Sequence, residues 1–85
     1  MSVFGYEQTV KFEVARDLLN SRRAHIAADL GRERTKVKPD PSAIGRLQAD
    51  MRAIAHSIRH LDVRDEAALD SVIAANRSRE FASVA

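Results

Sequence analysis

Apolar residues recur every three or four positions between residues 44 and 61, and this is the clearest pattern in the chain. The residues of this heptad seam are Ile44, Leu47, Met51, Ile54, Ile58 and Leu61. At about 100° per residue, they fall on one stripe of an α-helix. Asp40 and Pro41 directly precede the run and fit a carboxylate N-cap followed by proline in the first helical turn. The pattern predicts an amphipathic helix over about 41–61 that packs its seam against another surface.

The N-terminal part of the chain predicts a second long helix, over about 7–30, with apolar residues on a broad arc. The main stripe comprises Phe12, Ala15, Leu19, Ile26 and Leu30. A neighbouring stripe, the valine stripe, comprises Val10, Val14 and Leu18. Arg22 or Arg23 interrupts the main stripe, so we expect one arginine there to bury its stem and expose its charge. Gly31 is typical of a residue that ends a helix.

A shorter third helix is predicted over about 63–76. Asp62 can cap this helix, and Asp65 gives it an acidic first turn. Its apolar face comprises Leu69, Val72 and Ile73. Asn76 is the expected end of the helix, and residues 77–85 are expected to form a flexible tail.

The predicted elements form one small all-α domain, residues 1–85, with an antiparallel helical hairpin and a short third helix. With 85 residues and no cysteine, the chain can form only a small core and no disulfide brace. Such a domain is commonly completed by oligomerisation or by a permanent partner. No apolar run approaches the ~20 residues of a membrane span, and the N-terminus does not have the pattern of a signal peptide. We therefore expect a cytoplasmic protein with no membrane contact.

The predicted hairpin leaves the valine stripe uncovered, because the second helix can cover only one stripe of the first. A contiguous exposed apolar patch is uncommon on a monomer. We therefore expect a homodimer in which identical patches meet around a two-fold axis. Val14 and Leu18 are expected near its centre, with Val10, Phe4 and Tyr6 beside them. A second protein is the alternative occupant of this patch.

A local excess of basic residues follows the first predicted helix, although the chain carries a formal net charge of only +2. The basic residues are Arg32, Arg34, Lys36 and Lys38, against the acidic residue Glu33. Elsewhere acidic and basic residues are interleaved, which is typical of a solvated helix surface. The basic segment is the candidate contact for DNA or RNA, and binding through it would weaken steeply as salt rises.

Residues 25–31, followed by residues 34–37, resemble the core of a helix-turn-helix DNA-binding motif. The resemblance rests on an Ile-Ala pair, a Leu-Gly turn and Val37 six residues after the glycine. It implies a turn at Gly31 and a recognition helix after it. The chain departs from the motif at Arg32, where such motifs carry an apolar residue. It also departs at residues 39–41, whose two prolines would end the recognition helix early.

Residues 15–21, together with residues 39–41, are similar in layout to small helical antitoxins that inhibit Fic-type AMP-transferases. The inhibitory signature of that family is a serine or threonine followed four residues later by glutamate. Here Ser21 is followed at that position by His25, which has no carboxylate. The similarity therefore carries no functional residue over to this chain.

The sequence predicts no catalytic residue, cofactor or metal ion. His56 and His60 have the spacing of metal ligands on a helix, but no acidic or cysteine partner accompanies them. Glycine-rich phosphate loops and nucleophile motifs are absent from the sequence.

The function predicted from these patterns is a non-enzymatic helical interaction module that acts through its apolar helix faces. It would be an adaptor, a chaperone-like subunit or an inhibitory, antitoxin-type subunit, of the small bacterial regulatory kind. The alternative is a small DNA- or RNA-binding regulator that uses the basic segment.

Overall fold

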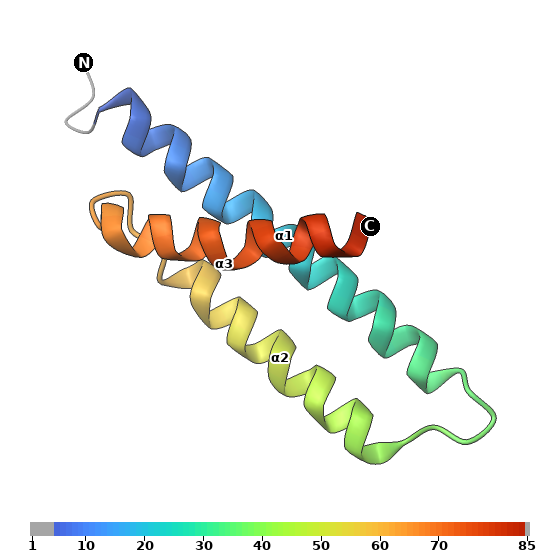
Figure 1. Ribbon diagram of the computed structural model, residues 1–85. Helices are drawn as coiled ribbons and strands as arrows, with labels where there is room; N and C mark the ends of the chain where they lie inside the picture. Colours follow the sequence, from blue (N-terminus) through green and yellow to red (C-terminus); the bar gives the residue numbers. More distant parts are fainter. Residues whose placement is uncertain (1–4, 85) are drawn as a thin grey trace.

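Three helices account for most of the chain. The computed structural model describes the backbone of residues 5–84 and the side chains of residues 5–77. The helices are α1 (Tyr6–Arg34), α2 (Pro41–Arg59) and α3 (Glu66–Val84), and no strand occurs within residues 5–84. Helix α2 returns along the C-terminal half of α1, and α3 crosses one face of this hairpin (Figure 1). The all-α hairpin with a third helix, predicted from the sequence, is confirmed.

The start of α2 follows from its capping residues. The Oδ1 atom of Asp40 accepts a hydrogen bond from the backbone N–H of Ser42 at 2.9 Å, and Pro41 occupies the first turn. The helix ends where the backbone N–H of His60 donates to the carbonyl oxygen of His56. Both bounds lie within two residues of the predicted ones.

The predicted end of α1 at Leu30 was wrong, because the helix continues through Gly31 to Arg34. No glycine within the described residues has the positive φ angle of a helix-ending glycine. The polar residues after Gly31 continue the helix instead, with an ion pair between Arg32 and Asp29, three residues apart. The C-cap is Thr35, whose backbone N–H donates to the carbonyl oxygen of Gly31 at 3.2 Å.

Helix α3 starts later than predicted, because Asp65 rather than Asp62 caps it. The Oδ1 atom of Asp65 accepts a hydrogen bond from the backbone N–H of Ala68 at 3.1 Å. Asp62 instead accepts hydrogen bonds from the backbone and side chain of Arg64, which lower the pKa of its carboxyl group below the ordinary value. This turn is therefore stabilised above the ordinary aspartate pKa of about 3.9, and the stabilisation is lost as the pH falls through the lowered value.

Helix α3 also extends beyond the predicted end at Asn76. Residues 77–84, expected to be a tail, are helical. The side-chain amide of Asn76 donates to the carbonyl oxygen of Val72 at 2.8 Å, within the helix, so it does not end the helix. The third helix is consequently as long as α2, with 19 residues each.

Helix α1 packs against both of the other helices. Leu19 and Ile26 of α1 form a buried cluster with Ile54 of α2. On the other side, Lys11 of α1 forms ion pairs with Glu66 and Asp70 of α3, at 2.7 Å and 3.0 Å, which raise the pKa of its ammonium group. Partly buried residues that pack on the cluster are Leu47, Met51, Ile58, Leu61 and Val72.

The fold is extended and thin. Its principal extents are 55 × 28 × 18 Å, and its radius of gyration is 15.4 Å, whereas a compact domain of this length has about 12 Å. The accessible surface is 6108 Å², whereas a folded monomer of this mass exposes about 5,000 Å². The thin shape therefore exposes more surface than a compact monomer of this mass.

We predict that Gly31→Ala stabilises the protein. A Cβ atom at Gly31 meets no atom within 4 Å, and alanine is favoured over glycine inside a helix by about 1 kcal/mol. The midpoint of thermal unfolding, followed by circular dichroism, should rise by about 4–8 °C. Ala28→Gly, on the exposed side of the same helix, is the matched control and should lower the midpoint by a similar amount. A lower midpoint for Gly31→Ala would contradict the continuous helix.

Candidate interaction surfaces

The valine stripe is exposed at one end only. Tyr6 is 84% exposed and Val10 is 37% exposed, whereas Val14 and Leu18 are partly buried. Val14 and Leu18 lie three and seven residues after Lys11, on the side of α1 that faces α3, so the longer α3 shelters them. The uncovered part of the predicted patch is therefore its N-terminal end, beside a shallow hollow of about 230 Å³. Phe4 lies outside the described residues.

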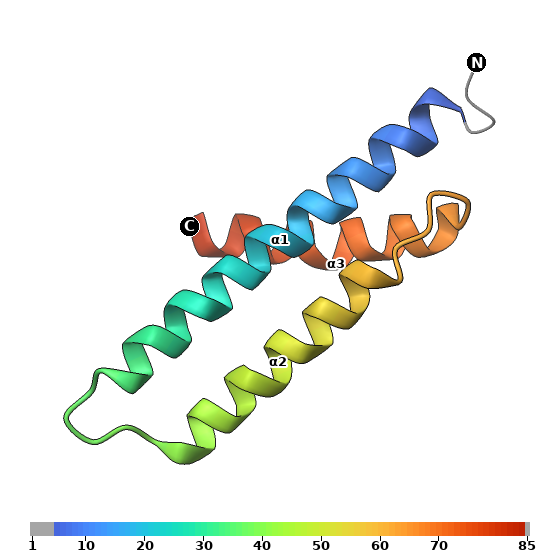
Figure 2. The same ribbon diagram turned by 180° about the vertical axis from the view of Figure 1, so that it is seen from behind.

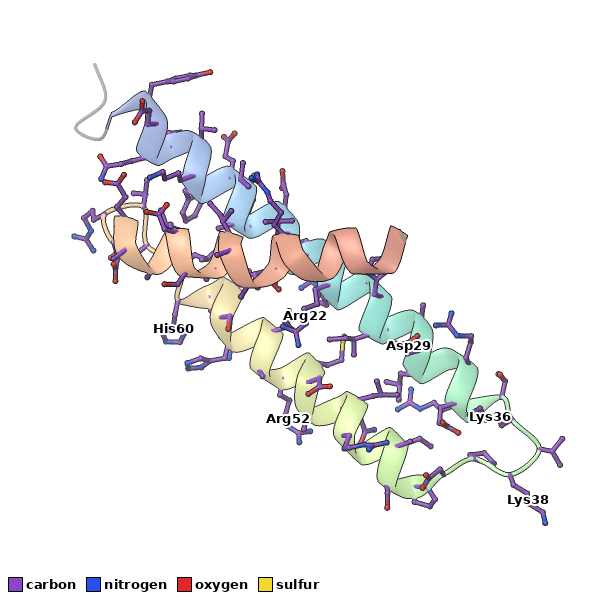
Figure 3. The ribbon with its side chains drawn as sticks, in the orientation of Figure 1. Arg22, Asp29, Lys36, Lys38, Arg52 and His60 are labelled. Carbon is purple, nitrogen blue, oxygen red and sulfur yellow. The ribbon has the colours of Figure 1, made fainter. Side chains whose placement is uncertain are left out.

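The basic segment is exposed, but acidic partners neutralise part of it. Arg32 and Arg34 end α1, and Lys36 and Lys38 lie in the connection at the end of the hairpin (Figure 3). Arg32 forms an ion pair with Asp29, and the Nζ atom of Lys36 lies 3.1 Å from the Oε1 atom of Glu33.

Glu33 has a structural role that the sequence did not indicate. Its side chain is only 11% exposed, although it is charged. Its Oε1 atom accepts from Lys36, and its Oε2 atom accepts from the backbone N–H of Asp40 at 3.3 Å. Since Asp40 caps α2, this carboxylate links the last turn of α1 to the first turn of α2. The alternating charges in the sequence did not indicate this contact, because it depends on how residues 35–40 fold back toward α1.

The hollow at this end of the hairpin is lined by both acidic and basic side chains. Its volume is about 500 Å³. Its charged lining residues are Asp29, Glu33 and Asp50 against Arg32, Lys36 and Arg46. The hollow is therefore not an electrostatic site for an anion or a cation.

The helix-turn-helix geometry implied by the resemblance at residues 25–37 does not form. Helix α1 passes through Gly31 without a turn, and residues 35–40 form a connection rather than a recognition helix. The basic segment therefore has no helix to place in a major groove.

His56 and His60 are exposed on the side of α2 away from α1, where Figure 3 labels His60. Their rings stack with centroids 4.0 Å apart, and the Nδ1 atom of His60 lies 2.8 Å from the carbonyl oxygen of His56. Among the described side chains, no three histidine, aspartate or glutamate residues gather as a metal site would require.

The heptad seam is covered by α1 along only one of its edges. Ile54 is buried, but the other five seam residues are only partly buried. Asp50 and Ser57 line a hollow beneath α3 and lie about 40–60° to one side of Ile54 around the helix. Ile44, Met51 and Ile58 lie about 40–80° to the other side.

Helix α1 likewise has one side that faces α3 and one side that faces away from it. Around the axis of α1, Lys11 lies to one side of the buried residue Ala15 and faces α3. Phe12 and Leu30 lie about 60° to the other side of Ala15, away from α3. Both are partly buried. We call the resulting side of the hairpin the back face; its apolar residues are Phe12, Leu30, Ile44, Met51 and Ile58.

No described helix covers the back face. In the view from behind, α1 and α2 lie in front of α3, and none of residues 5–84 crosses over them (Figure 2). The sequence located these apolar residues but assigned the whole seam to the core. Periodicity shows how wide a stripe is, but it does not show on which side of the hairpin the third helix lies.

A second hollow, of about 290 Å³, lies between the three helices. Asn76 of α3 lines it and is 6% exposed. Its Oδ1 atom is buried and has no hydrogen-bond partner among the described residues. An unpaired buried acceptor destabilises a fold, so this amide weakens the attachment of α3.

We predict that Asn76→Leu stabilises the protein by about 1 kcal/mol, because it removes the unpaired oxygen and adds apolar contact in the hollow. Denaturant unfolding followed by circular dichroism measures the change. Asn76→Asp is the control and should destabilise the fold, because it buries a charge. A loss of stability in Asn76→Leu would show that the amide oxygen is held by a bound donor.

The comparisons with known proteins gave no assignment. No family model, curated protein or solved structure matches this chain. Within the described part of the chain, no helix is long and apolar enough to cross a membrane.

Proposed function

We propose that this protein is a non-enzymatic interaction module whose helix faces bind other protein chains. The observation that carries the proposal is the back face of the hairpin, whose apolar residues are partly exposed and covered by none of the described helices. Here α3 covers one side of the hairpin, and a row of apolar residues remains partly exposed on the other.

The size of the exposed surface supports this proposal. The accessible area of 6108 Å² exceeds that of a typical folded monomer of this mass by about 1,100 Å². A stable protein–protein interface removes about 800 Å² from each partner. The excess is therefore large enough for one complete interface.

The hollows support binding rather than catalysis. The hollow of about 500 Å³ is lined by acidic and basic side chains that partly neutralise one another, and the two others described above have volumes of about 290 and 230 Å³. Enzyme sites usually combine an enclosed pocket with titratable groups of shifted pKa. The pKa shifts of Lys11, Asp62 and Arg64 arise from ion pairs at the surface. The absence of cysteine suits a cytoplasmic role, which belongs to the same proposal.

Self-association through the valine stripe is the second part of the proposal. Tyr6 and Val10 are the exposed large apolar residues of α1, and they lie one helical turn apart. Two copies related by a two-fold axis would bring these ends together. In this arrangement Val14 and Leu18 lie toward α3 and contribute only their exposed edges.

We predict that light scattering at micromolar concentration reports twice the monomer mass of 9.4 kDa. Val10→Glu should reduce the mass to that of one chain, because identical charges would face each other across the axis. Ala24→Glu, on an exposed part of α1 away from the stripe, is the control and should leave the dimer intact. A parent protein that remains monomeric would reject the dimer and leave the interaction module without self-association.

The nucleic-acid alternative remains a prediction with no specific observation in its favour, since acidic neighbours pair with two of the four basic residues. Binding to a duplex that falls steeply between about 50 and 200 mM salt would establish it.

A further inference from the structure

We propose that the back face binds an acidic amphipathic helix of another protein. This inference rests on the proposed function, because it names the chemistry of the partner that the interaction module takes. It follows from two observations, the shape of the apolar strip and the sign of the charges beside it.

The apolar strip has the dimensions of a helix-binding groove. Phe12 and Leu30 are eighteen residues apart on α1, which corresponds to about 27 Å along the helix. Ile44, Met51 and Ile58 form a second row on α2, about 21 Å long. Because α2 runs along the C-terminal half of α1 (Figure 1), Leu30 lies beside the α2 row and Phe12 lies beyond its end. A helix laid along these residues can place side chains at i, i+3, i+4 and i+7 against both helices. A partner helix of about 18 residues would cover the strip.

Arginines flank this strip. Arg16, Arg23 and Arg34 lie on the back side of α1, about 80–100° from Ala15, and all three are exposed. Arg52 and Arg59 are exposed on the outer edge of α2, and Figure 3 shows Arg52 pointing away from α1.

Several acidic residues are on the other side of the fold. Asp29 and Asp50 line the hollow at the end of the hairpin, and Glu66 and Asp70 belong to α3. On α1, Glu13 lies about 60° beyond the arginine row, and the Oδ1 atom of Asp17 lies 3.9 Å from the Nε atom of Arg16. The back face is therefore basic although the whole chain is nearly neutral.

The charge of the face selects the partner. A second copy of this chain would bring the same arginines to both sides of the contact, and like charges facing each other oppose binding. A helix with glutamate or aspartate beside its apolar stripe pairs with them instead. Arg16 also has its guanidinium carbon 5.9 Å above the ring of Phe12, so its charge is already held at the edge of the strip.

The apolar residues distinguish a helix from a nucleic acid or a lipid surface. Ile44, Met51 and Ile58 are aliphatic, and the guanidinium of Arg16 lies over the ring of Phe12, so the strip offers no row of rings on which bases could stack. Their inner edges pack against the hairpin, with Met51 and Ile58 touching the buried cluster. They therefore form a shallow strip rather than protruding side chains that could enter a bilayer. A complementary apolar row on a helix fits such a strip.

The test uses two synthetic peptides of about 21 residues, a length that spans the strip. One has leucine at alternating spacings of three and four with glutamate at the flanking positions; in the other, lysine replaces each glutamate. Fluorescence anisotropy of the labelled peptides, titrated with the full chain at low and moderate salt, measures the affinity. We expect the acidic peptide to bind at least about tenfold more tightly than the basic one.

Charge reversal locates the site. Arg16→Glu/Arg23→Glu should lower the affinity for the acidic peptide by about tenfold or more and raise that for the basic peptide. Arg46→Glu/Lys38→Glu changes the net charge equally on exposed positions away from the back face, and should have a much smaller effect. Circular dichroism of both variants checks that the fold is intact, as expected for exposed positions.

Five outcomes overturn the inference. Equal binding of the two peptides, or equal effects of the two double variants, would remove the role of the back-face arginines. If anionic vesicles or a DNA duplex bind more tightly than the acidic peptide, and Arg16→Glu/Arg23→Glu abolishes that binding, the face recognises phosphate. If no probe binds but sedimentation shows a dimer that Met51→Glu disrupts, a second copy occupies the face and the proposed function stands. If no probe binds and the chain is a monomer, the proposed function fails as well.

Discussion

The packing of Ile54 against Leu19 and Ile26 is the contact on which the rest of the structure depends. It joins α1 to α2, and Leu47, Met51, Ile58 and Leu61 of the seam pack against it. Because this cluster comprises only three buried side chains, it joins the two helices but leaves both sides of the hairpin open to other contacts. The hairpin therefore has two faces, and the position of α3 decides which of them solvent reaches.

The hairpin was predictable from the sequence because its determinants are local. The seam, the Asp40–Pro41 start and the length of α2 all follow from periodicity and capping within a few residues of each other. The ends of α1 and α3 were not predictable in this way. Gly31 would end α1 only if the chain reversed direction there. The chain reverses about one turn later, where the side chain of Glu33 accepts a hydrogen bond from the backbone of Asp40. Asn76 is polar but buried by tertiary packing, so its residue type misleads a local analysis.

The candidate surfaces divide in the same way. The exposed end of the valine stripe at Tyr6 and Val10 was predictable, because it depends on one helix only. The sheltering of Val14 and Leu18 was not, since it required the length and direction of α3. The charge of the back face was also hidden in the sequence, where acidic and basic residues alternate. Folding separates them, because residues that are neighbours along a helix point in directions about 100° apart.

The Glu33–Asp40 hydrogen bond has a consequence for the order in which the chain folds. It spans only seven residues, and a loop of about ten residues closes within about 10–100 ns. The ion pair between Lys11 and Glu66, by contrast, joins residues 55 positions apart. We expect the hairpin to close first and α3 to dock last, as local contacts generally precede distant ones. During synthesis the hairpin then exists for a time before α3 covers its front face, and the residues that α3 will cover are accessible to other chains in that interval.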